Sequence, residues 1–529
     1  MAAVDSKASG SALAPLANAT FRALWIATIA SNVGTWVQDV GESWLMTTLS
    51  SSPMMVALVD AAANLPLFLL ALPAGALADV VDRRRLLLVT QTWMTCTAAG
   101  LALSTTFGLT NQWTLLLFSL ALGFGAAMNA PAWQATTPEL VSRDELPAAL
   151  TLNSAAINVS RAIGPAIGGL LVAASGPAAA FWLNAVSFIG VLIVLARWKR
   201  SSPKSRLPSE HMLGAMRAGV RYVRHLRSFR AVLVRAGLFL ICGSAISAIL
   251  PVFARTTMRM SSGGYGVLLG CMGVGALVGA VLIPRLRRNI STEKLVAAAT
   301  VTFAAVLATL ALVRIVPLLY FAMFVGGIAW LTLLSSFNIA AQSAVAEWVR
   351  ARALSVYLLV FAGALTGGSL LWGALATRLG IPAAFLCAAG GLLVGMLAAV
   401  RFRLPTATLD LTPSLHWPEP VLSLETEGDR GPVLVLVEYE IDPAQRAAFV
   451  DAIHELRAVR LRDGALGWTL YQDAAAPRRC VEAFTLDTWA EHLRQHARVS
   501  VADRALEDSV RAFHTGTEPP LVTHLVGGS

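Results

Sequence analysis

The chain has 529 residues, of which 56% are hydrophobic and 14% are charged, and its formal net charge is +10. Soluble domains carry about 25% charged residues, so this composition excludes an ordinary soluble protein. Residues 1–404 hold 30 Lys and Arg against 12 Asp and Glu, whereas residues 405–529 hold 11 against 19. The positive excess lies between apolar stretches, which favours a role in membrane topology over nucleic-acid binding.

The five Cys are scattered and odd in number, so neither a disulfide framework nor a zinc-binding spacing is indicated. Residues 1–20 are polar and form a predicted N-terminal tail, with no short apolar core before a cleavage site. We therefore expect the first apolar stretch to remain as a membrane helix rather than to leave as a signal peptide.

About twelve apolar stretches fill residues 21–403, and most are long enough to cross a hydrocarbon core of about 30 Å. The predicted membrane helices cover residues 22–47, 54–78, 84–107, 112–132, 149–174, 178–197, 233–254, 264–284, 294–313, 316–340, 353–376 and 382–402. Lys and Arg fall in alternate gaps, with 25 on one side and 4 on the other. Because short cytoplasmic loops retain positive charge, both termini are expected in the cytoplasm.

The longest and most basic gap separates six predicted spans from six. Within it, apolar residues recur at helical spacing beside Arg residues, which predicts an amphipathic helix on the inner leaflet, with a solvated linker as the alternative. The apolar residues are Met212, Met216, Val220 and Val223. This pattern predicts an N-terminal half at 21–197, a cytoplasmic loop at 198–232 and a C-terminal half at 233–404.

The second half repeats the first. At an offset of 208 residues, Gln134, Glu139 and Val141 align with Gln342, Glu347 and Val349. Two parallel six-helix halves that bind a substrate at their interface form an architecture of secondary transporters. The sequence therefore predicts an all-α polytopic membrane protein of twelve helices in two halves.

Two motifs resemble those of the major facilitator superfamily. Gly75-x-x-x-Asp79-x-x-x-Arg83-Arg84 is similar to the family's loop between its second and third helices, although Val80 and Asp82 depart from the usual pattern. The resemblance implies that Asp79 holds an inner gate shut, and Arg352 is a candidate partner for it.

The second motif, Gly164-Pro165-Ala-Ile-Gly168-Gly169, is similar to the antiporter motif of the family's exporters, with Ser160 in place of an earlier Gly. Stretches 31–38 and 347–352 resemble a bacterial branch of secretion transporters that includes enterobactin exporters. The resemblance implies alternating access and export.

Ionisable side chains inside the hydrocarbon are costly, so each one points to a transport pathway or to a partner. Asp39, Asp60 and Arg161 come at compatible depths, since a helix rises 1.5 Å per residue. We expect Arg161 to pair with one of these carboxylates, either for proton coupling or as a structural ion pair. Glu42 is expected near the outer mouth, in reach of water.

Aromatic and amide side chains inside the spans are candidates to line a substrate cavity. They are Trp36, Gln38, Asn338 and Gln342. For Trp36, anchoring at the membrane interface is the alternative.

The last part of the chain changes pattern. Residues 405–431 hold four Pro and are predicted to form a linker. Strands are predicted at 433–440, 466–472, 480–486 and 521–526, with helices at 443–462 and 488–513. This order predicts a ferredoxin-like α+β domain at 432–527, which resembles the small barrels related to antibiotic-biosynthesis monooxygenases. His492 and His496 share a helix face, but no third ligand is in register, so a surface or packing role is favoured over metal binding.

The predicted function is proton-coupled export of a small amphipathic molecule, such as a siderophore or an antibiotic. No Walker sequence is present, which argues against ATP drive, and no cofactor and no catalytic set are expected. The acidic tail is expected to dock, to dimerise or to sense a ligand. Two alternatives stay open: a membrane-anchored oxygenase or sensor that acts through the tail, and an importer.

Overall fold

The computed structural model describes residues 13–142, 144–198, 221–404, 410–414, 416–417 and 430–527. It divides into two compact units. The first unit comprises Met1–Leu207, Val234–Phe337 and Leu358–Arg401, and the second comprises Pro208–Leu233, Asn338–Tyr357 and Phe402–Ser529. The second unit thus contains the C-terminal domain together with two segments from the ends of membrane helices.

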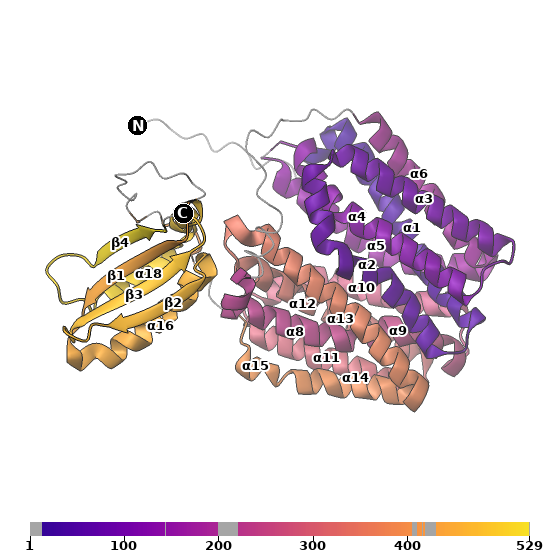
Figure 1. Ribbon diagram of the computed structural model, residues 1–529. Coiled ribbons are helices and arrows are strands. Elements are labelled where there is room, and N and C mark those ends of the chain that lie inside the picture. The colour runs from indigo at the N-terminus through magenta and orange to yellow at the C-terminus, as the bar shows by residue number, and fades with distance from the viewer. Residues whose placement is uncertain are drawn as a thin grey trace, which may run out of the picture. The chain divides into compact units, whose positions relative to one another are not determined.

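The helices form two groups in sequence order (Figure 1). The N-terminal group consists of α1 (Ala19–Leu49), α2 (Pro53–Val80), α3 (Arg83–Thr106), α4 (Gln112–Leu140), α5 (Leu146–Ser175) and α6 (Pro177–Arg197), after a short η1 (Ala14–Ala17). The C-terminal group consists of α8 (Arg227–Gly243), α9 (Ala245–Val252), η2 (Phe253–Thr257), α10 (Ser262–Leu286), α11 (Thr292–Leu312), α12 (Val316–Ser343), η3 (Glu347–Val349), α13 (Arg350–Leu379), α14 (Ile381–Gly395) and α15 (Ala398–Arg401).

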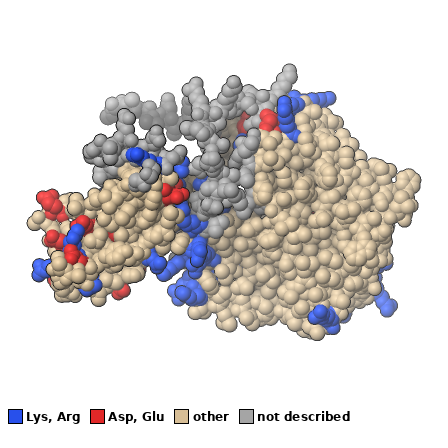
Figure 2. All heavy atoms as spheres, viewed as in Figure 1, with Lys and Arg blue, Asp and Glu red and all other residues tan. Residues whose placement is uncertain are grey.

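Eleven helices in the described part of the chain are long and apolar enough to cross a membrane. Helix α1 has 31 residues but is not among them, and it carries Gln38, Asp39 and Glu42. Figure 2 shows a broad face of the bundle without charged side chains. Large apolar side chains that are exposed on the helices include Leu69, Val89, Leu117, Leu170, Val186, Phe321 and Val394. The chain is therefore a multi-pass membrane protein.

Local sequence explains where the helices begin. Asn18 caps α1 by accepting hydrogen bonds from the backbone N–H of Thr20 and Phe21, and Asn111 caps α4 in the same way. Gly176 joins α5 to α6 with φ +78°, and Gly380 joins α13 to α14 with φ +86°. Side chains rarely adopt such left-handed angles, so these two glycines make the one-residue turns at equivalent places in the two groups.

The predicted span at 233–254 differs from the structure in two ways. Helical structure begins earlier, at Arg227, and the helix is interrupted at Ser244 before it ends in the short π-helix η2. The amphipathic helix predicted within 198–232 falls mostly outside the described residues, although residues 221–225 are helical.

The C-terminal domain contains four strands: β1 (Val433–Glu440), β2 (Gly467–Gln472), β3 (Arg479–Leu486) and β4 (Leu521–Val526). They form one antiparallel sheet in the order β2-β3-β1-β4. Its helices are α16 (Arg446–Asp463), α17 (Trp489–Arg498) and α18 (Val501–Arg511), with η4 (Pro443–Gln445) before α16. Alternate residues of β1 are buried, and they pack in one core with residues of α16 such as Phe449 and Ile453.

The single helix predicted at 488–513 is wrong, because the structure has two helices there. The Ser500 side chain accepts a hydrogen bond from the N–H of Asp503, and the Asp503 carboxylate accepts one from the N–H of Ser500. This capping box starts a new helix, and the Ser500-x-x-Asp503 spacing is the sequence signal that the helical pattern over 488–513 concealed.

Candidate functional site

The two helix groups touch near the end of the bundle at which α1 joins α2, called here the α1–α2 end. Trp44 of α1 stacks on Tyr265 of α10, with ring centroids 5.9 Å apart. Arg255 of η2 donates a hydrogen bond to the Thr47 hydroxyl of α1 over 3.2 Å. Gly373 of α13 is so close to α2 that an added Cβ would lie 2.5 Å from the Ala57 Cβ. The two groups are therefore in direct contact at this end.

The predicted antiporter motif supplies small residues on two faces of α5. An added Cβ would lie 2.5 Å from the Trp36 Cβ at Gly164 and 2.9 Å from the Val37 Cα at Gly168, so these two glycines pack α5 on α1. At Gly169 it would lie 2.5 Å from the Cα of Gly266 in α10. Gly169 therefore serves the contact between the two groups, since small residues let helices approach closely. Pro165 lies within α5 and is buried.

Asp60 links the two groups through hydrogen bonds. Its Oδ2 accepts a hydrogen bond from Ser247 of α9 over 3.1 Å and another from Ser369 of α13. Asn64 of α2 donates to the Asp60 carbonyl oxygen over 2.9 Å. A carboxylate of the N-terminal group thus meets hydroxyls from two helices of the C-terminal group. These bonds must break if the groups separate at this end.

The structure does not bring Arg161 against a carboxylate. Its guanidinium lies over the ring of Trp36, 5.4 Å from the centroid, and its Nε has no hydrogen-bond partner. Among the described residues, no ion pair joins Arg161 to Asp39 or Asp60, and Asp39 is exposed. The pairing of Arg161 with one of these carboxylates stays a prediction. The Arg161 contact places Trp36 inside the bundle, and Trp36 is half-buried there.

Two residues of α1 lie elsewhere than expected. Gln38 was a candidate to line a cavity, but only 2% of it is exposed. Glu42 was expected to reach water, but only 4% of it is exposed. Gln38 donates to Glu42 and accepts from Asn184 of α6, each over 2.6 Å. Both side chains therefore belong to the interior of the N-terminal group, which the spacing along α1 alone does not show.

The predicted gating loop is described only in part. The side chain of Asp79 lies outside the described part of the structure, as do the surroundings of Gly75, so the contact between Asp79 and Arg352 stays a prediction. Arg83 forms an ion pair with Glu139 of α4 over 2.7 Å. Arg84 donates to the carbonyl oxygens of Leu195 and Ala196, over 3.0 Å and 2.7 Å. Both Arg residues thus tie helix ends of the N-terminal group together, and cationic side chains favour helix C-termini.

The other two cavity candidates lie on α12. Asn338 and Gln342 are exposed, and the Gln342 amide donates a hydrogen bond to the Asn338 side chain. They form a polar patch one turn long near the end of this helix. Arg352 is half-buried in the first turn of α13.

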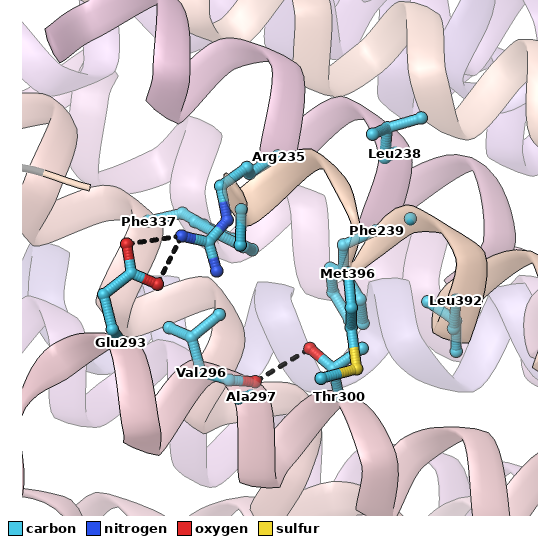
Figure 3. Close-up of a pocket in the computed structure, with 12 residues that line it drawn as sticks. Arg235, Leu238, Phe239, Glu293, Val296, Ala297, Thr300, Phe337, Leu392 and Met396 are labelled. Atoms are coloured by element: carbon cyan, nitrogen blue, oxygen red, sulfur yellow. Dashed lines mark hydrogen bonds and ion pairs between the residues drawn. The ribbon is translucent and has the colours of Figure 1, made fainter. Parts of the chain in front are cut away.

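The sequence prediction missed a buried ion pair in the C-terminal group. Arg235 of α8, only 8% exposed, donates to both carboxylate oxygens of Glu293 in α11, over 2.7 Å and 2.6 Å. The pair borders a cavity of about 60 Å³ that is also lined by Phe239, Thr300 and Met396 (Figure 3). Because drug-sized ligands need about 300–1,000 Å³, this cavity suits a few water molecules rather than such a ligand.

The C-terminal domain has a charged interior that the sequence prediction also missed. Arg460 of α16 forms ion pairs with Glu482 over 3.1 Å and with Glu507 over 2.6 Å. The stretch predicted as a linker contributes to this interior, because His416 and Trp417 each contact the Glu507 carboxylate over 2.8 Å. The signal available in the sequence was the acidic balance of the tail, which does not say which charges are buried.

Within the second unit, the C-terminal domain contacts the connection between α12 and α13. The Arg498 guanidinium of α17 lies 4.4 Å from the ring centroid of Trp348. Tyr222 meets the same Trp348 edge to face at 5.5 Å and accepts a hydrogen bond from the Ala346 N–H over 3.3 Å. Glu491 of α17 pairs with Arg221 over 3.1 Å. Arg, Trp and Tyr are the residue types that dominate protein interfaces.

Two histidines on α17 face the interior of the domain. The Nε2 atoms of His492 and His496 are 3.3 Å apart, and the side chain of Gln495 between them is buried without a hydrogen-bond partner. Burial, with smaller effects from His496 and His524, lowers the pKa of His492 to about 3. Burial, followed by the effect of His524, lowers the pKa of His496 to about 4.

These two pKa values predict a domain that loses stability in mild acid. The folded domain keeps both imidazoles neutral, whereas the unfolded chain binds protons near pH 6.5, so the free energy of unfolding should fall as the pH drops from about 6.5 towards 4. Hydrogen exchange of α17 in the full chain should therefore show less protection at about pH 5 than at about pH 7, after correction for intrinsic rates. The double variant His492→Asn, His496→Gln should lose most of this pH dependence. Equal protection of the wild-type helix at both pH values would contradict it.

Comparisons with known proteins agree with this architecture. Residues 10–528 match the family model described as transmembrane secretion effector. The multidrug efflux pump Tap of Mycolicibacterium fortuitum is 27% identical over 394 residues, which cover 72% of this chain and 94% of that protein. The staphyloferrin A transporter of Staphylococcus aureus is 24% identical over 49% of this chain, and the enterobactin exporter EntS of Escherichia coli is 27% identical over 51%. The chain spans 65% and 64% of the length of these last two relatives.

Solved structures show the same fold at low sequence identity. A bacterial homologue of the human lysosomal transporter Spinster, in an inward-facing and unoccupied conformation, aligns with a TM-score of 0.57 and 14% identity over 73% of this chain and 97% of that chain. A bacterial homologue of the iron transporter ferroportin aligns with a TM-score of 0.55 and 16% identity over 73% of this chain and 98% of that chain.

Proposed function

Since the chain belongs to the transmembrane secretion effector family of the major facilitator superfamily, we propose that it is a secondary active exporter of a small amphipathic molecule. Siderophores and antibiotics are the proposed substrate classes, because the similar proteins include a staphyloferrin A transporter, an enterobactin exporter and a multidrug efflux pump. Protons are the proposed coupling ion. The family and the helical bundle support a transport role rather than an enzymatic one.

The observation that carries this proposal is the direct contact between the two helix groups at the α1–α2 end. Gly169 against Gly266, and Asp60 against Ser247 and Ser369, join the groups through small residues and hydrogen bonds. Such contacts can break without leaving large apolar surfaces exposed. Alternating access requires two bodies that separate at one end while they meet at the other, so this contact is a gate.

The proposed topology has twelve membrane helices, with α1 as the first. Both termini lie on the cytoplasmic side of the bacterial inner membrane. The gaps at the α1–α2 end hold only 4 of the Lys and Arg between spans, against 25 at the other end, which supports this orientation. The α1–α2 end is then the outer side, and the contacts described above close the protein to the outside. The halves at 21–197 and 233–404, joined by the basic loop at 198–232, are the two moving bodies.

The test of the function is efflux from proteoliposomes loaded with candidate siderophores and antibiotics. A proton gradient should drive uphill efflux, an uncoupler should abolish it, and Asp39→Asn and Asp60→Asn should weaken it. Accumulation in the opposite direction would identify an importer. An efflux rate that is changed neither by the uncoupler nor by the two substitutions would contradict proton coupling.

We further propose that residues 432–527 form a ferredoxin-like domain that docks on the α12–α13 connection and acts in regulation rather than in catalysis. The strand order β2-β3-β1-β4 with the order βαββαβ along the chain supports the fold. The contacts of Arg498 with Trp348 and of Glu491 with Arg221 support docking. Dimerisation through this domain is a second proposed interaction, which its exposed sheet edges at β2 and β4 would permit.

Docking predicts that Arg498→Ala loosens the α12–α13 connection, in addition to removing the hydrogen bonds of Arg498 to Glu491 and to the Asp463 carbonyl oxygen within the domain. A buried cation–π contact contributes about 2 kcal/mol, so hydrogen-exchange protection of residues 344–349 should fall by roughly tenfold or more, given that about 1.4 kcal/mol is a factor of ten. The matched control is Arg504→Ala, which removes the same charge from a surface pair whose Arg side chain is 53% exposed. Equal protection in both variants would show that the domain is tethered rather than docked.

A further inference from the structure

Glu42 is a buried acid with no part in the gate described above. It is 4% exposed on α1, in the helix group whose interior holds an apolar cluster that includes Leu45, Leu101, Leu115 and Phe181. Its two carboxyl oxygens meet only neutral groups: Oε1 accepts from the Gln38 amide over 2.6 Å, and Oε2 lies 2.5 Å from the Ser119 hydroxyl. An ionised carboxylate in such surroundings needs a cationic partner.

The charged groups on the elements packed against α1 are engaged elsewhere. Arg161 of α5 lies over Trp36, and Arg255 of η2 donates to Thr47. Asp39 and Asp60 are themselves acids, so neither supplies a positive charge to this region. Helices α4 and α6 face Glu42 and Gln38 with the neutral side chains of Ser119 and Asn184. Among the described residues, no cation neutralises Glu42.

The hydrogen-bond partners of Ser119 indicate whether Glu42 is protonated. Its hydroxyl lies 3.0 Å from the Leu115 carbonyl oxygen as well as 2.5 Å from Glu42 Oε2. A serine hydroxyl has one hydrogen and two acceptor sites, and a carbonyl oxygen only accepts. If Ser119 donates to Leu115, then its oxygen accepts from Glu42, and Glu42 must carry the hydrogen. The carboxyl group is then neutral, and every atom has a partner.

The other side of the network agrees with a neutral acid. Asn184 Nδ2 donates to Gln38 Oε1, so the Gln38 Nε2 is the end of the amide that faces Glu42 Oε1. Oε1 is then the carbonyl oxygen of the acid and Oε2 its hydroxyl. The chain of donors runs from Asn184 through Gln38, Glu42 and Ser119 to the Leu115 carbonyl, in a single direction without conflict.

We propose that Glu42 holds a proton in this conformation and is the proton-binding site of the N-terminal group. This inference rests on the proposed proton-coupled export. When α1 moves relative to α4 in the other conformation, Ser119 withdraws, the O–H bond of Glu42 breaks, and the proton passes to water, which leaves a carboxylate. Asp39, three residues earlier on the same helix and exposed, is the titratable group through which the proton reaches water.

The test uses Glu42→Gln in the full-length protein, because Gln has the shape and neutrality of the protonated acid. Glu455→Gln, an exposed position on α16, is the matched control. Substrate counterflow, which needs no net proton movement, should stay within about twofold of wild type, whereas efflux driven by a pH gradient should fall at least about tenfold, as expected when a group with a role in coupling no longer titrates. Wild-type counterflow with unchanged pH-driven efflux in Glu42→Gln would overturn the proposal.

A second readout does not depend on transport. The infrared C=O stretch of protonated carboxyl groups should lose intensity in Glu42→Gln relative to the wild type at neutral pH. An unchanged band in the variant would also overturn the proposal, since the proton would lie on another acid. Failure of the proposed proton-coupled export can be distinguished from failure of the Glu42 proposal. In the first case wild-type efflux would be insensitive to the uncoupler, whatever the infrared spectra show.

Discussion

Gly169→Leu should open the protein at the α1–α2 end and reduce transport by at least about tenfold. An added Cβ at this position would lie 2.5 Å from the Gly266 Cα and 2.7 Å from the Ser262 carbonyl oxygen, both backbone atoms that cannot turn away. Overpacking costs about 1–3 kcal/mol, and about 1.4 kcal/mol shifts an equilibrium tenfold. The closed state should therefore lose most of its population.

The measurement combines efflux with labelling of Ser262→Cys by a maleimide that does not cross membranes, in a background without the native cysteines. Ser262 is 5% exposed in the closed state, so labelling should be slow in the parent protein and fast in Gly169→Leu. Gly190→Leu is the control, because an added Cβ there meets nothing within 4 Å. Slow labelling and normal efflux in Gly169→Leu would show that this contact does not form the gate.

Asp60→Ala should loosen the same end by a different mechanism. The substitution leaves the Ser247 and Ser369 hydroxyls without their carboxylate acceptor, and Ser369 is fully buried. Hydrogen bonds to charged groups contribute about 1.5–3 kcal/mol each, so we expect faster labelling at position 262 and efflux reduced by roughly tenfold. Asp144→Ala, at an exposed position between α4 and α5, should change neither.

A double-mutant cycle distinguishes loss of the contact between Asp60 and Ser369 from a general loss of stability. If Asp60 acts through Ser369, then Ser369→Ala alone should have a similar effect, and the two substitutions together should cost less than the sum. Strict additivity would mean that Asp60 acts through other groups, such as the proton pathway.

Charge distribution and apolar length made the membrane part predictable. Lys and Arg in alternate gaps fixed which helix ends lie together, and the helices α3, α6 and α11 begin and end within a few residues of their predicted bounds. Strand period and turn residues likewise placed β1, β3 and β4 correctly. These features are predictable because contact with water or lipid imposes a pattern of apolar and polar residues along a whole segment.

The interior contacts were less predictable, because they depend on which faces meet. Glu42 was expected near water, yet Ser119 of another helix lies beside it. The ion pair of Arg235 and Glu293 joins two helices 58 residues apart, and nothing in either local pattern indicates it. The interruption at Ser244 and the new helix at Ser500 depend on single side chains or turns within stretches that otherwise read as continuous helix.

The one-residue turns at Gly176 and Gly380 limit how much of this protein is accessible from outside the cell. The connections at the α1–α2 end cover residues 50–52, 107–111, 176, 258–261, 313–315 and 380. Proteases and antibodies need several residues of accessible backbone, so a protein in the proposed orientation offers them almost none from outside. An epitope for detection on intact cells would have to be inserted, and 107–111 is the longest of these connections.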